Sequence, residues 1–383
     1  MSPTLRISSL AGEMRAAGDD VLDFSAGQPD FPTPERVKQA GKRAIEENRT
    51  GYTANQGLPE FRAAIAAMLE RERGLSYDAD EILVSPGAKA SLYFAATALF
   101  DPGDEVLVPS PYWVTYPEQV RLCGAVPVFV DCPESNGFKL DPSDLEKAIG
   151  PRTKALLLNY PSNPTGICYA AEELSPLAEI CGRLGVWIVA DEIYSRLIFD
   201  GRTFTSVAAV DAADRERVLV IDGMSKAYSM TGWRIGYAAG PRELIAAMGR
   251  VQSHSTSNAT SISQWASVEA LKLTAADLQS RVDEFQERRD VIVSALRELP
   301  GVTCCNPEGS FYAFPRVTGC LGEERSSGEQ VAAFLLEQAK VAVVPGEAFG
   351  AAEHVRMSYA LGMDRLQQGL GRISRALAER RAG

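Results

Sequence analysis

The middle of the chain alternates short apolar runs, rich in β-branched residues, with segments of helical periodicity, and this alternation restricts the fold more than any other feature. The runs are apolar at nearly every position, which is typical of strands covered on both faces. Helical patterns at 88–100 and 170–185 separate some of them. We therefore predict an α/β fold with a mainly parallel sheet. The six predicted strands cover residues 81–85, 104–110, 125–130, 154–160, 186–191 and 217–222.

Beyond about residue 265 the pattern changes, and a chain of 383 residues is long enough for a second domain. Residues 264–299 predict one long connecting helix. We expect a large domain at 33–283 and a small domain formed by 1–32 together with 284–383. The last third predicts a smaller α+β unit, with extended segments at 309–317, 341–346 and 354–360 and helices near 327–340 and from about 363.

Composition and charge exclude several classes of function. The net charge of −11 argues against nucleic acid or an anionic membrane as the main partner. Seven cysteines, without a C-x-x-C pair, indicate reduced thiols and a cytoplasmic protein. We recognise neither a signal peptide nor an apolar run long enough to span a membrane. The two histidines, His254 and His354, fit neither a zinc site nor a serine triad, so we predict no metal.

Polar and aromatic side chains follow five of the predicted strands directly, at the edge of the sheet where open α/β proteins bind ligands. They offer a glycine turn that opens a helix, an aromatic ring, an amide, an acid with a phenol, and a lysine. A glycine turn at a helix N-terminus presents N–H groups that can hold a phosphate. In chain order these residues are Gly87 and Ala88, Trp113, Asn163, Asp191 and Tyr194, and Lys226.

One cofactor, pyridoxal 5′-phosphate (PLP), would use all of these groups. Its aldehyde needs an amine, which Lys226 would supply as a Schiff base. Its pyridine nitrogen stays protonated beside a buried carboxylate, for which Asp191 is the candidate. We predict that Asn163 and Tyr194 contact its phenolate oxygen and that Trp113 stacks on its ring.

The phosphate of this cofactor needs N–H groups and a cation. The candidates for the N–H groups are Gly87, Ala88 and Ser225. The candidate for the cation is Arg234, eight residues after Lys226. A lone lysine after a strand is usually a solvated surface residue. The S-K-x7-R spacing and the other strand-end residues favour a catalytic Lys226 instead.

The stretch "GMSKAYSMTGWRIGY" at 223–237 resembles the PLP-attachment signature of class I aminotransferases. The resemblance runs from about residue 20 to the C-terminus and is strongest to the bacterial aspartate aminotransferase subgroup. It implies the type I fold of PLP-dependent transferases, with a seven-stranded sheet in the large domain and a small α+β domain. The other matching segments are "AGQPDFPTP", "GYTANQGLPEFR", "NYPSNPTG", "VADEIY" and "HVRMSYA".

The same resemblance implies a set of substrate contacts. Arg356 matches an arginine that binds the α-carboxylate of the substrate, and Gly27 matches a backbone contact to that carboxylate. Trp113 and Asn163 are expected to contact the substrate as well as the cofactor.

Three further features come from the resemblance alone. Tyr52 matches a tyrosine that reaches the phosphate of the neighbouring subunit, which implies a homodimer with shared sites. Lys89 lies where the subgroup carries a lysine for the distal carboxylate of aspartate, although it could equally be a lysine on a helix surface. The N-terminal "SPTLRIS" resembles a segment that folds over the substrate.

We expect an enzyme that moves the amino group of an amino acid, foremost aspartate, to a 2-oxo acid, foremost 2-oxoglutarate, by a ping-pong mechanism. Aromatic, prephenate or alanine specificity fits the same residues, as does a PLP-dependent lyase on this fold. A regulatory module that binds PLP without turnover is disfavoured, because the sequence has neither an added N-terminal domain nor a basic patch. The resemblance also implies cis peptide bonds at Ser110–Pro111 and Asn163–Pro164.

Overall fold

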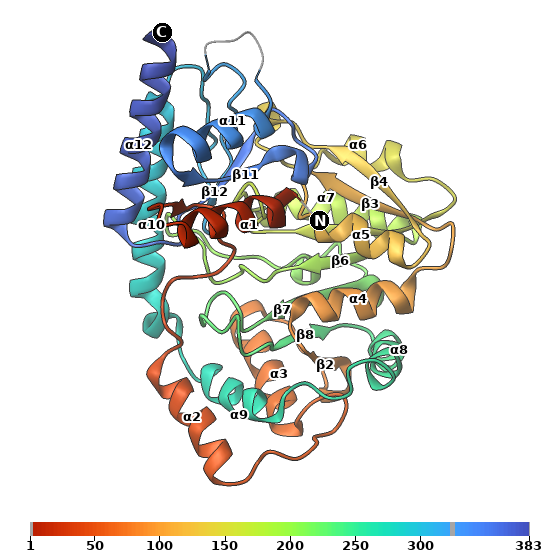
Figure 1. Cartoon of the computed structure of the whole chain (residues 1–383). Helices are drawn as coiled ribbons and strands as arrows, with labels where there is room; N and C mark the ends of the chain where they lie inside the picture. The colour runs from red at the N-terminus through yellow and green to blue at the C-terminus, as the bar shows by residue number, and fades with distance from the viewer. Residues whose placement is uncertain (1–2, 322–325, 383) are drawn as a thin grey trace.

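A central sheet organises the computed structural model, which describes residues 3–321 and 326–382 (Figure 1). Within these residues seven strands form one sheet in the order β2–β8–β7–β6–β5–β3–β4. β8 runs antiparallel to β2 and β7, and the neighbouring pairs from β7 to β4 are parallel. The α/β prediction is therefore confirmed. The strands are β2 (Ile82–Ser85), β3 (Glu105–Ser110), β4 (Val126–Asp131), β5 (Thr153–Asn159), β6 (Trp187–Asp191), β7 (Val218–Gly223) and β8 (Gly236–Ala239).

Strand β8 has no counterpart among the six predicted strands. Its sequence, "GYAA", is short and carries no β-branched residue, so it lacks the local pattern of a strand. Its place depends on close backbone contacts instead. A Cβ on Gly236 would lie 2.1 Å from the Ala88 nitrogen, and one on Gly223 would lie 2.8 Å from the Gly236 Cα. Glycine at these positions lets β8 fit between β2 and β7.

Helices cover both faces of the sheet, and alternate residues of one strand enter different cores. Leu219 and Ile221 of β7 pack in a cluster with side chains of α4 (Ala88–Leu99), α5 (Thr115–Leu122) and α8 (Arg242–Ser253). Val218 and Val220 pack in the cluster of the opposite face. The helices of that face are α3 (Pro59–Arg73), α7 (Ala171–Leu184) and α9 (Ser261–Ala270), with α2 (Glu35–Glu46) packed on α9 and α6 (Pro142–Ala148) on α7. Burial on both sides explains why the strands are apolar throughout.

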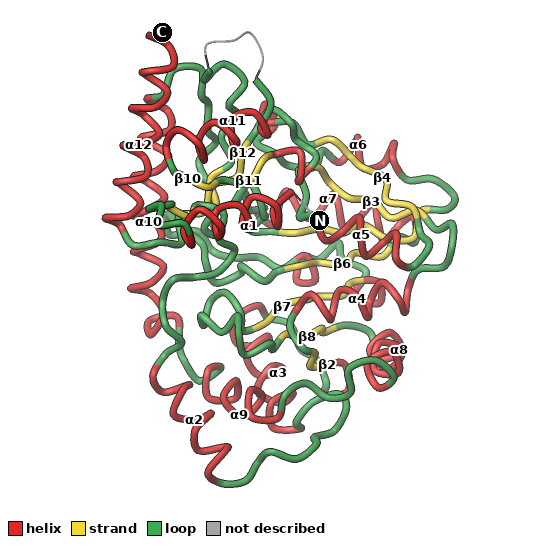
Figure 2. The backbone as a smooth tube through the Cα atoms, in the orientation of Figure 1, coloured by secondary structure: helices red, strands yellow, loops and turns green. Residues whose placement is uncertain are grey.

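The last third of the chain forms a separate hydrophobic cluster with its own short strands (Figure 2). In the described part of the chain β11 (Val344–Pro345), β12 (Val355–Ser358) and β9 (Tyr312–Ala313) form an antiparallel sheet. β1 (Leu22–Asp23) pairs with β10 (Val341–Ala342), which joins the N-terminal segment to this unit. The helices here are α1 (Pro3–Ala16), α11 (Gly328–Phe334) and the adjacent α10 (Ala275–Glu298) and α12 (Met363–Ala382) (Figure 1).

The prediction of a single helix at 264–299 is wrong. α9 ends at Ala270 and α10 begins at Ala275, and Thr274 caps the second helix. The Thr274 side chain accepts a hydrogen bond from the Asp277 amide, and the Asp277 carboxylate accepts one from the Thr274 amide. Such a capping box stabilises a helix start by about 1 kcal/mol. The helix predicted at 327–340 is also interrupted, because α11 passes at Leu335 into a wider π-helical turn.

No helix among the described residues is long and apolar enough to cross a membrane. Ser110–Pro111 and Asn163–Pro164 are cis, as predicted, and Tyr160–Pro161 is a third cis bond.

Candidate active site

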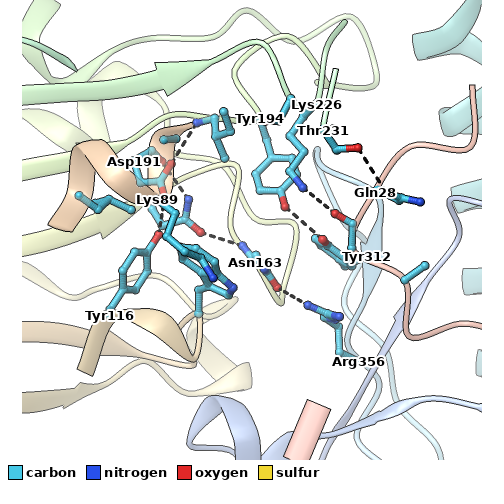
Figure 3. Close-up of a pocket in the computed structure, with 18 of the residues that line it drawn as sticks. Gln28, Lys89, Tyr116, Asn163, Asp191, Tyr194, Lys226, Thr231, Tyr312 and Arg356 are labelled. Atoms are coloured by element: carbon cyan, nitrogen blue, oxygen red, sulfur yellow. Dashed lines mark hydrogen bonds between the residues drawn. The ribbon is translucent and has the colours of Figure 1, made fainter. Parts of the chain in front are cut away.

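A cavity of about 590 Å³ opens where the carboxyl ends of the strands face the C-terminal unit. Its lining includes every predicted site residue except Gly87 and Tyr52. Figure 3 shows Asp191, Tyr116 and Lys89 on one side, Tyr312 and Arg356 on the other, and Asn163 between them. The predicted residues that line it are Gly27, Ala88, Lys89, Trp113, Asn163, Asp191, Tyr194, Ser225, Lys226, Arg234 and Arg356.

Lys226 points into this cavity from the loop that follows β7. Its Nζ donates a hydrogen bond of 2.6 Å to the Gly27 carbonyl oxygen and lies 5.6 Å from the centre of the Tyr194 ring. Burial, together with the charge of Arg356, lowers the pKa of Lys226 to about 8, and the Asp191 carboxylate opposes this shift. The amine is therefore available as a nucleophile or base close to neutral pH.

Asp191 is the last residue of β6 and is buried beside the cavity. Tyr116 Oη donates to its Oδ2 at 2.8 Å, and the Ile193 amide donates to its Oδ1 at 3.2 Å. Burial raises the pKa of Asp191 to about 6, although both hydrogen bonds favour the charged form. Sequence analysis missed Tyr116. It lies three residues after Trp113, at the start of α5, and this closeness in sequence was the available sign that it shares the site.

Arg356 and Asn163 hold one another at the opposite wall. Arg356 Nη1 donates to Asn163 Oδ1 at 3.0 Å, and Nη2 donates to the Ser25 carbonyl oxygen at 2.9 Å. The guanidinium carbon lies 4.4 Å from the centre of the Tyr312 ring. Among the described residues Arg356 Nε, which is buried, has no hydrogen-bond partner. The arginine is fixed in place and keeps capacity to bind an anion.

Tyr312 of β9 is a second residue that sequence analysis missed. Its hydroxyl lies 3.1 Å from the hydroxyl of Tyr194, and both rings are buried. A Cβ on Gly27 would lie 3.4 Å from the Tyr312 Oη, so the chain runs close to this hydroxyl. Tyr312 lies within the short aromatic run "FYAF", which predicts a buried strand, so nothing local marks its hydroxyl as part of a site.

The turn before α4 forms the polar end of the cavity. Gly87 has φ +92°, and a Cβ there would lie 2.5 Å from Arg234 Nη2. Glycine is needed for both reasons, the left-handed conformation and the close guanidinium. The first N–H groups of α4 have no partner within the helix. Together with Ser225 and Arg234 they make an end of the cavity that suits a phosphate, although Gly87 itself does not line it.

The model of the aminotransferase class I and II family matches residues 19–373. The chain belongs to this family. It is 48% identical to the aspartate/prephenate aminotransferase of Cereibacter sphaeroides over 97% of this chain and 95% of that protein, and 46% identical to the aspartate aminotransferase of Geobacillus stearothermophilus over 99% and 97%. The predicted family resemblance is confirmed.

Solved structures agree with the family assignment. The aspartate aminotransferase of Rhizobium meliloti superposes with a TM-score of 0.96 at 45% identity, covering 99% of this chain and 96% of that one. The Thermus thermophilus aspartate aminotransferase with maleate gives a TM-score of 0.92 at 42% identity, covering 98% and 97%. This aminotransferase therefore shares the whole fold of these enzymes.

Lys89 of the aminotransferase lines the cavity, and its side chain is also exposed to solvent. Its Nζ lies 4.8 Å from the centre of the Trp113 ring, and the Gln119 side chain donates to its backbone oxygen at 3.0 Å. Burial, together with the charge of Arg234, lowers the pKa of Lys89. The ammonium group is therefore positioned by the ring and faces the same space as Arg356.

Tyr52 lies apart from the cavity of its own chain and is 94% exposed. The N-terminal segment expected to fold over the substrate begins at Ser2, which lies outside the described residues, as do the side chains of residues 3–8.

Proposed function

We propose that this aminotransferase uses PLP to transfer the amino group of aspartate to 2-oxoglutarate. The observation that carries the proposal is the placement of Lys226, Asp191 and Arg356 around one cavity, an amine, a buried acid and a fixed guanidinium. The relatives named as aspartate aminotransferases support the choice of substrate.

The residues present fit PLP. When bound, PLP supplies an electron-accepting ring and an aldehyde that condenses with amines. Lys226 would hold the aldehyde, and Asp191 the ring N–H. Arg356 engages Asn163 Oδ1, which leaves the amide NH₂ of Asn163 for the phenolate oxygen beside Tyr194. Trp113 would cover the ring. The phosphate would lie between the turn at Gly87 and Ala88 and the side chains of Ser225 and Arg234.

Each side chain of this site then has its own role in the reaction. Arg356 binds the α-carboxylate of the amino acid, with the backbone of Gly27 beside it, and so orients the Cα–H bond. Lys226 Nζ takes the proton from Cα and later returns one, which a pKa lowered by burial to about 8 permits. Asp191 holds negative charge at the ring nitrogen, where burial strengthens the interaction.

Lys89 supports aspartate over donors with an apolar side chain. Its ammonium group faces the cavity opposite Arg356, so a donor with two carboxylates could bind both cations. Prephenate remains a second candidate, because three of the relatives are named for both substrates, two of them as probable. Aromatic and alanine donors lack the second carboxylate.

The residues also support a homodimer with shared sites. Tyr52 is almost fully exposed in one chain, which is unusual for a large aromatic side chain and fits a place against a second copy. We propose the domain limits 33–283 for the large domain and 1–32 with 284–383 for the small one, supported by the pairing of β1 with β10. A cytoplasmic location agrees with seven free cysteines in the described chain.

A panel of amino donors tests the proposal. Purified protein with PLP is mixed with 2-oxoglutarate and one amino donor, and glutamate formation is measured. The donors are aspartate, phenylalanine, alanine and the amino acid that transamination of prephenate would form. We expect the highest kcat/KM with aspartate. Pyruvate and ammonia released from one substrate without an oxo acid would identify a lyase instead.

A further inference from the structure

A buried cluster of charges lies behind the cavity, on the other face of the sheet. Asp191 pairs in register with Ile221, whose side chain packs with α4 and α8. Asp222 pairs with Tyr237, which belongs to the core of the opposite face. The Glu192 amide donates to the Ile221 carbonyl, so Glu192 continues the alternation after Asp191. The carboxyl ends of β6 and β7 thus carry acids on both faces.

Arg73, the last residue of α3, joins the acids of this cluster. Its Nη1 donates to Glu192 Oε2 at 2.5 Å, and its Nη2 donates to Ser195 Oγ at 2.7 Å and to Asp222 Oδ2. The side chains of Arg73, Glu192 and Asp222 are at most 3% exposed. Gly74, in the left-handed conformation, ends α3 directly after Arg73.

Each partner of Arg73 is close in sequence to a residue of the cavity. Glu192 follows Asp191, Ser195 follows Tyr194, and Asp222 precedes Lys226 by four residues. A shift of either strand end would move these cavity residues together, because neighbours along a strand share its backbone.

The carboxylates of the cluster are fully bonded. Tyr160 Oη and Ser206 Oγ donate to Glu192 Oε1 at 3.1 and 2.6 Å. The Gly223 amide donates to Asp222 Oδ1, and Ser195 and Tyr237 donate to its Oδ2. Nothing is left to bind a ligand. The other titratable groups packed around the cluster are Glu72, Tyr77, Tyr228 and Arg196, the last paired with Glu72 at 2.6 Å.

We propose that Arg73 is a positioning residue for the reaction: by neutralising Glu192 and Asp222 it fixes the ends of β6 and β7, and so the distance and the charge balance between Asp191 and Lys226. The inference rests on the proposed PLP chemistry. It differs from a purely structural role, because loss of the Arg73 charge changes the field at the cavity as well as the stability.

The sign of the electrical effect follows from the contacts. Burial raises the pKa of Glu192 to about 7 even with Arg73 beside it, and Asp222 is among the charges that raise the pKa of Asp191. Arg73 lowers the pKa of Glu192, so removing the guanidinium favours the neutral acid form of Glu192 and leaves the charge of Asp222 without its cation behind the site. Positive charge at Lys226 is then favoured. The protonated nitrogen that joins Lys226 to PLP should therefore have a higher pKa, so the pH midpoint of the absorbance change should rise.

Arg73→Met tests the proposal, with Arg289→Met as the matched control. Arg289 is 2% exposed and forms two hydrogen bonds to Asp200, at 2.6 and 2.9 Å, outside the cavity. Visible absorbance gives the PLP affinity and the pH midpoint of the chromophore, and thermal unfolding of the PLP-free protein gives stability. We expect both variants to unfold at lower temperature. Arg73→Met alone should raise the midpoint by about 0.5 pH unit and weaken PLP binding about tenfold.

Two more variants complete the design. Asp222→Asn added to Arg73→Met removes the charge left without its cation and should return the midpoint toward the wild-type value. If Arg73→Met does not fold, Arg73→Lys is compared with Arg289→Lys, and weaker PLP binding is expected in the first alone. Equal midpoints and affinities for the Arg73 and Arg289 variants would overturn the inference. A wild-type protein that forms no PLP chromophore would overturn the proposed function instead.

Discussion

The two faces of the sheet at the ends of β6 and β7 both carry buried or partly buried charges, but they use them differently. On the cavity face Lys226 bonds to one backbone carbonyl, Lys89 lies against a ring, and Arg356 Nε has no partner among the described residues. On the opposite face every oxygen of Glu192 and Asp222 accepts a hydrogen bond. Burial of charge is common to both faces. The two faces differ because charged groups of the cavity face keep hydrogen-bonding capacity for a ligand, whereas the carboxylates of the opposite face use theirs within the protein.

The largest effect is expected from removing the amine of the cavity face. Lys226→Ala should abolish transamination and the visible absorbance of lysine-bound PLP, because Lys226 is the amine that would hold the aldehyde. Absorbance spectra and glutamate formation measure both. Unimpaired turnover by this variant would contradict the assignment of Lys226.

Asp191 and Glu192 are neighbours on opposite faces and allow a direct comparison. Asp191→Asn keeps the shape and the hydrogen bond with Tyr116 but removes the charge facing the cavity, so kcat should fall about a thousandfold. Glu192→Gln, the matched change on the other face, should cost far less. Single-turnover rates with aspartate measure the difference. Similar losses for the two variants would mean that the faces are not distinct in function.

Lys89→Ala tests how the cavity face chooses its substrate. We expect kcat/KM for aspartate to fall about a hundredfold, in the range of a lost charge-assisted contact, with much less change for alanine or phenylalanine. Steady-state kinetics with the three donors measure this. An equal loss for all three would show that Lys89 does not read the distal carboxylate.

The smallest effect concerns the stability cost of the cavity charges. The folded protein has a Lys226 pKa of about 8 against an ordinary 10.5, so folding disfavours the charged amine. The penalty is complete below pH 8 and disappears above pH 10.5. Lys226→Met should therefore gain stability relative to the wild type as the pH falls, by about 2 °C in Tm or more. Thermal unfolding of both PLP-free proteins across this range gives the difference, and a difference independent of pH would refute the shift.

Much of the site could be predicted because its residues follow apolar strands directly. Asp191 ends the run "VWIVAD", Lys226 follows "RVLVID" by four residues, and parallel strands bring their ends to one edge. Tyr116 and Tyr312 could not be found in this way. Tyr116 looks like one more apolar residue of α5, and Tyr312 lies on a two-residue strand of the other unit.

The sequence by itself determined the parallel strands, the residues at their ends and the family, because these depend on local patterns of apolar residues and on short motifs. Thr274 and Asp277, the capping box that begins α10 and divides the expected long helix, are also a local signal. Only the tertiary structure decided two things. β8 exists because Gly223 and Gly236 allow backbones to approach closely. Arg73 bonds to Asp222, 149 residues away in the chain. In the sequence Arg73 is one of several charges at the end of a helix, and burial between distant acids gives it a different role.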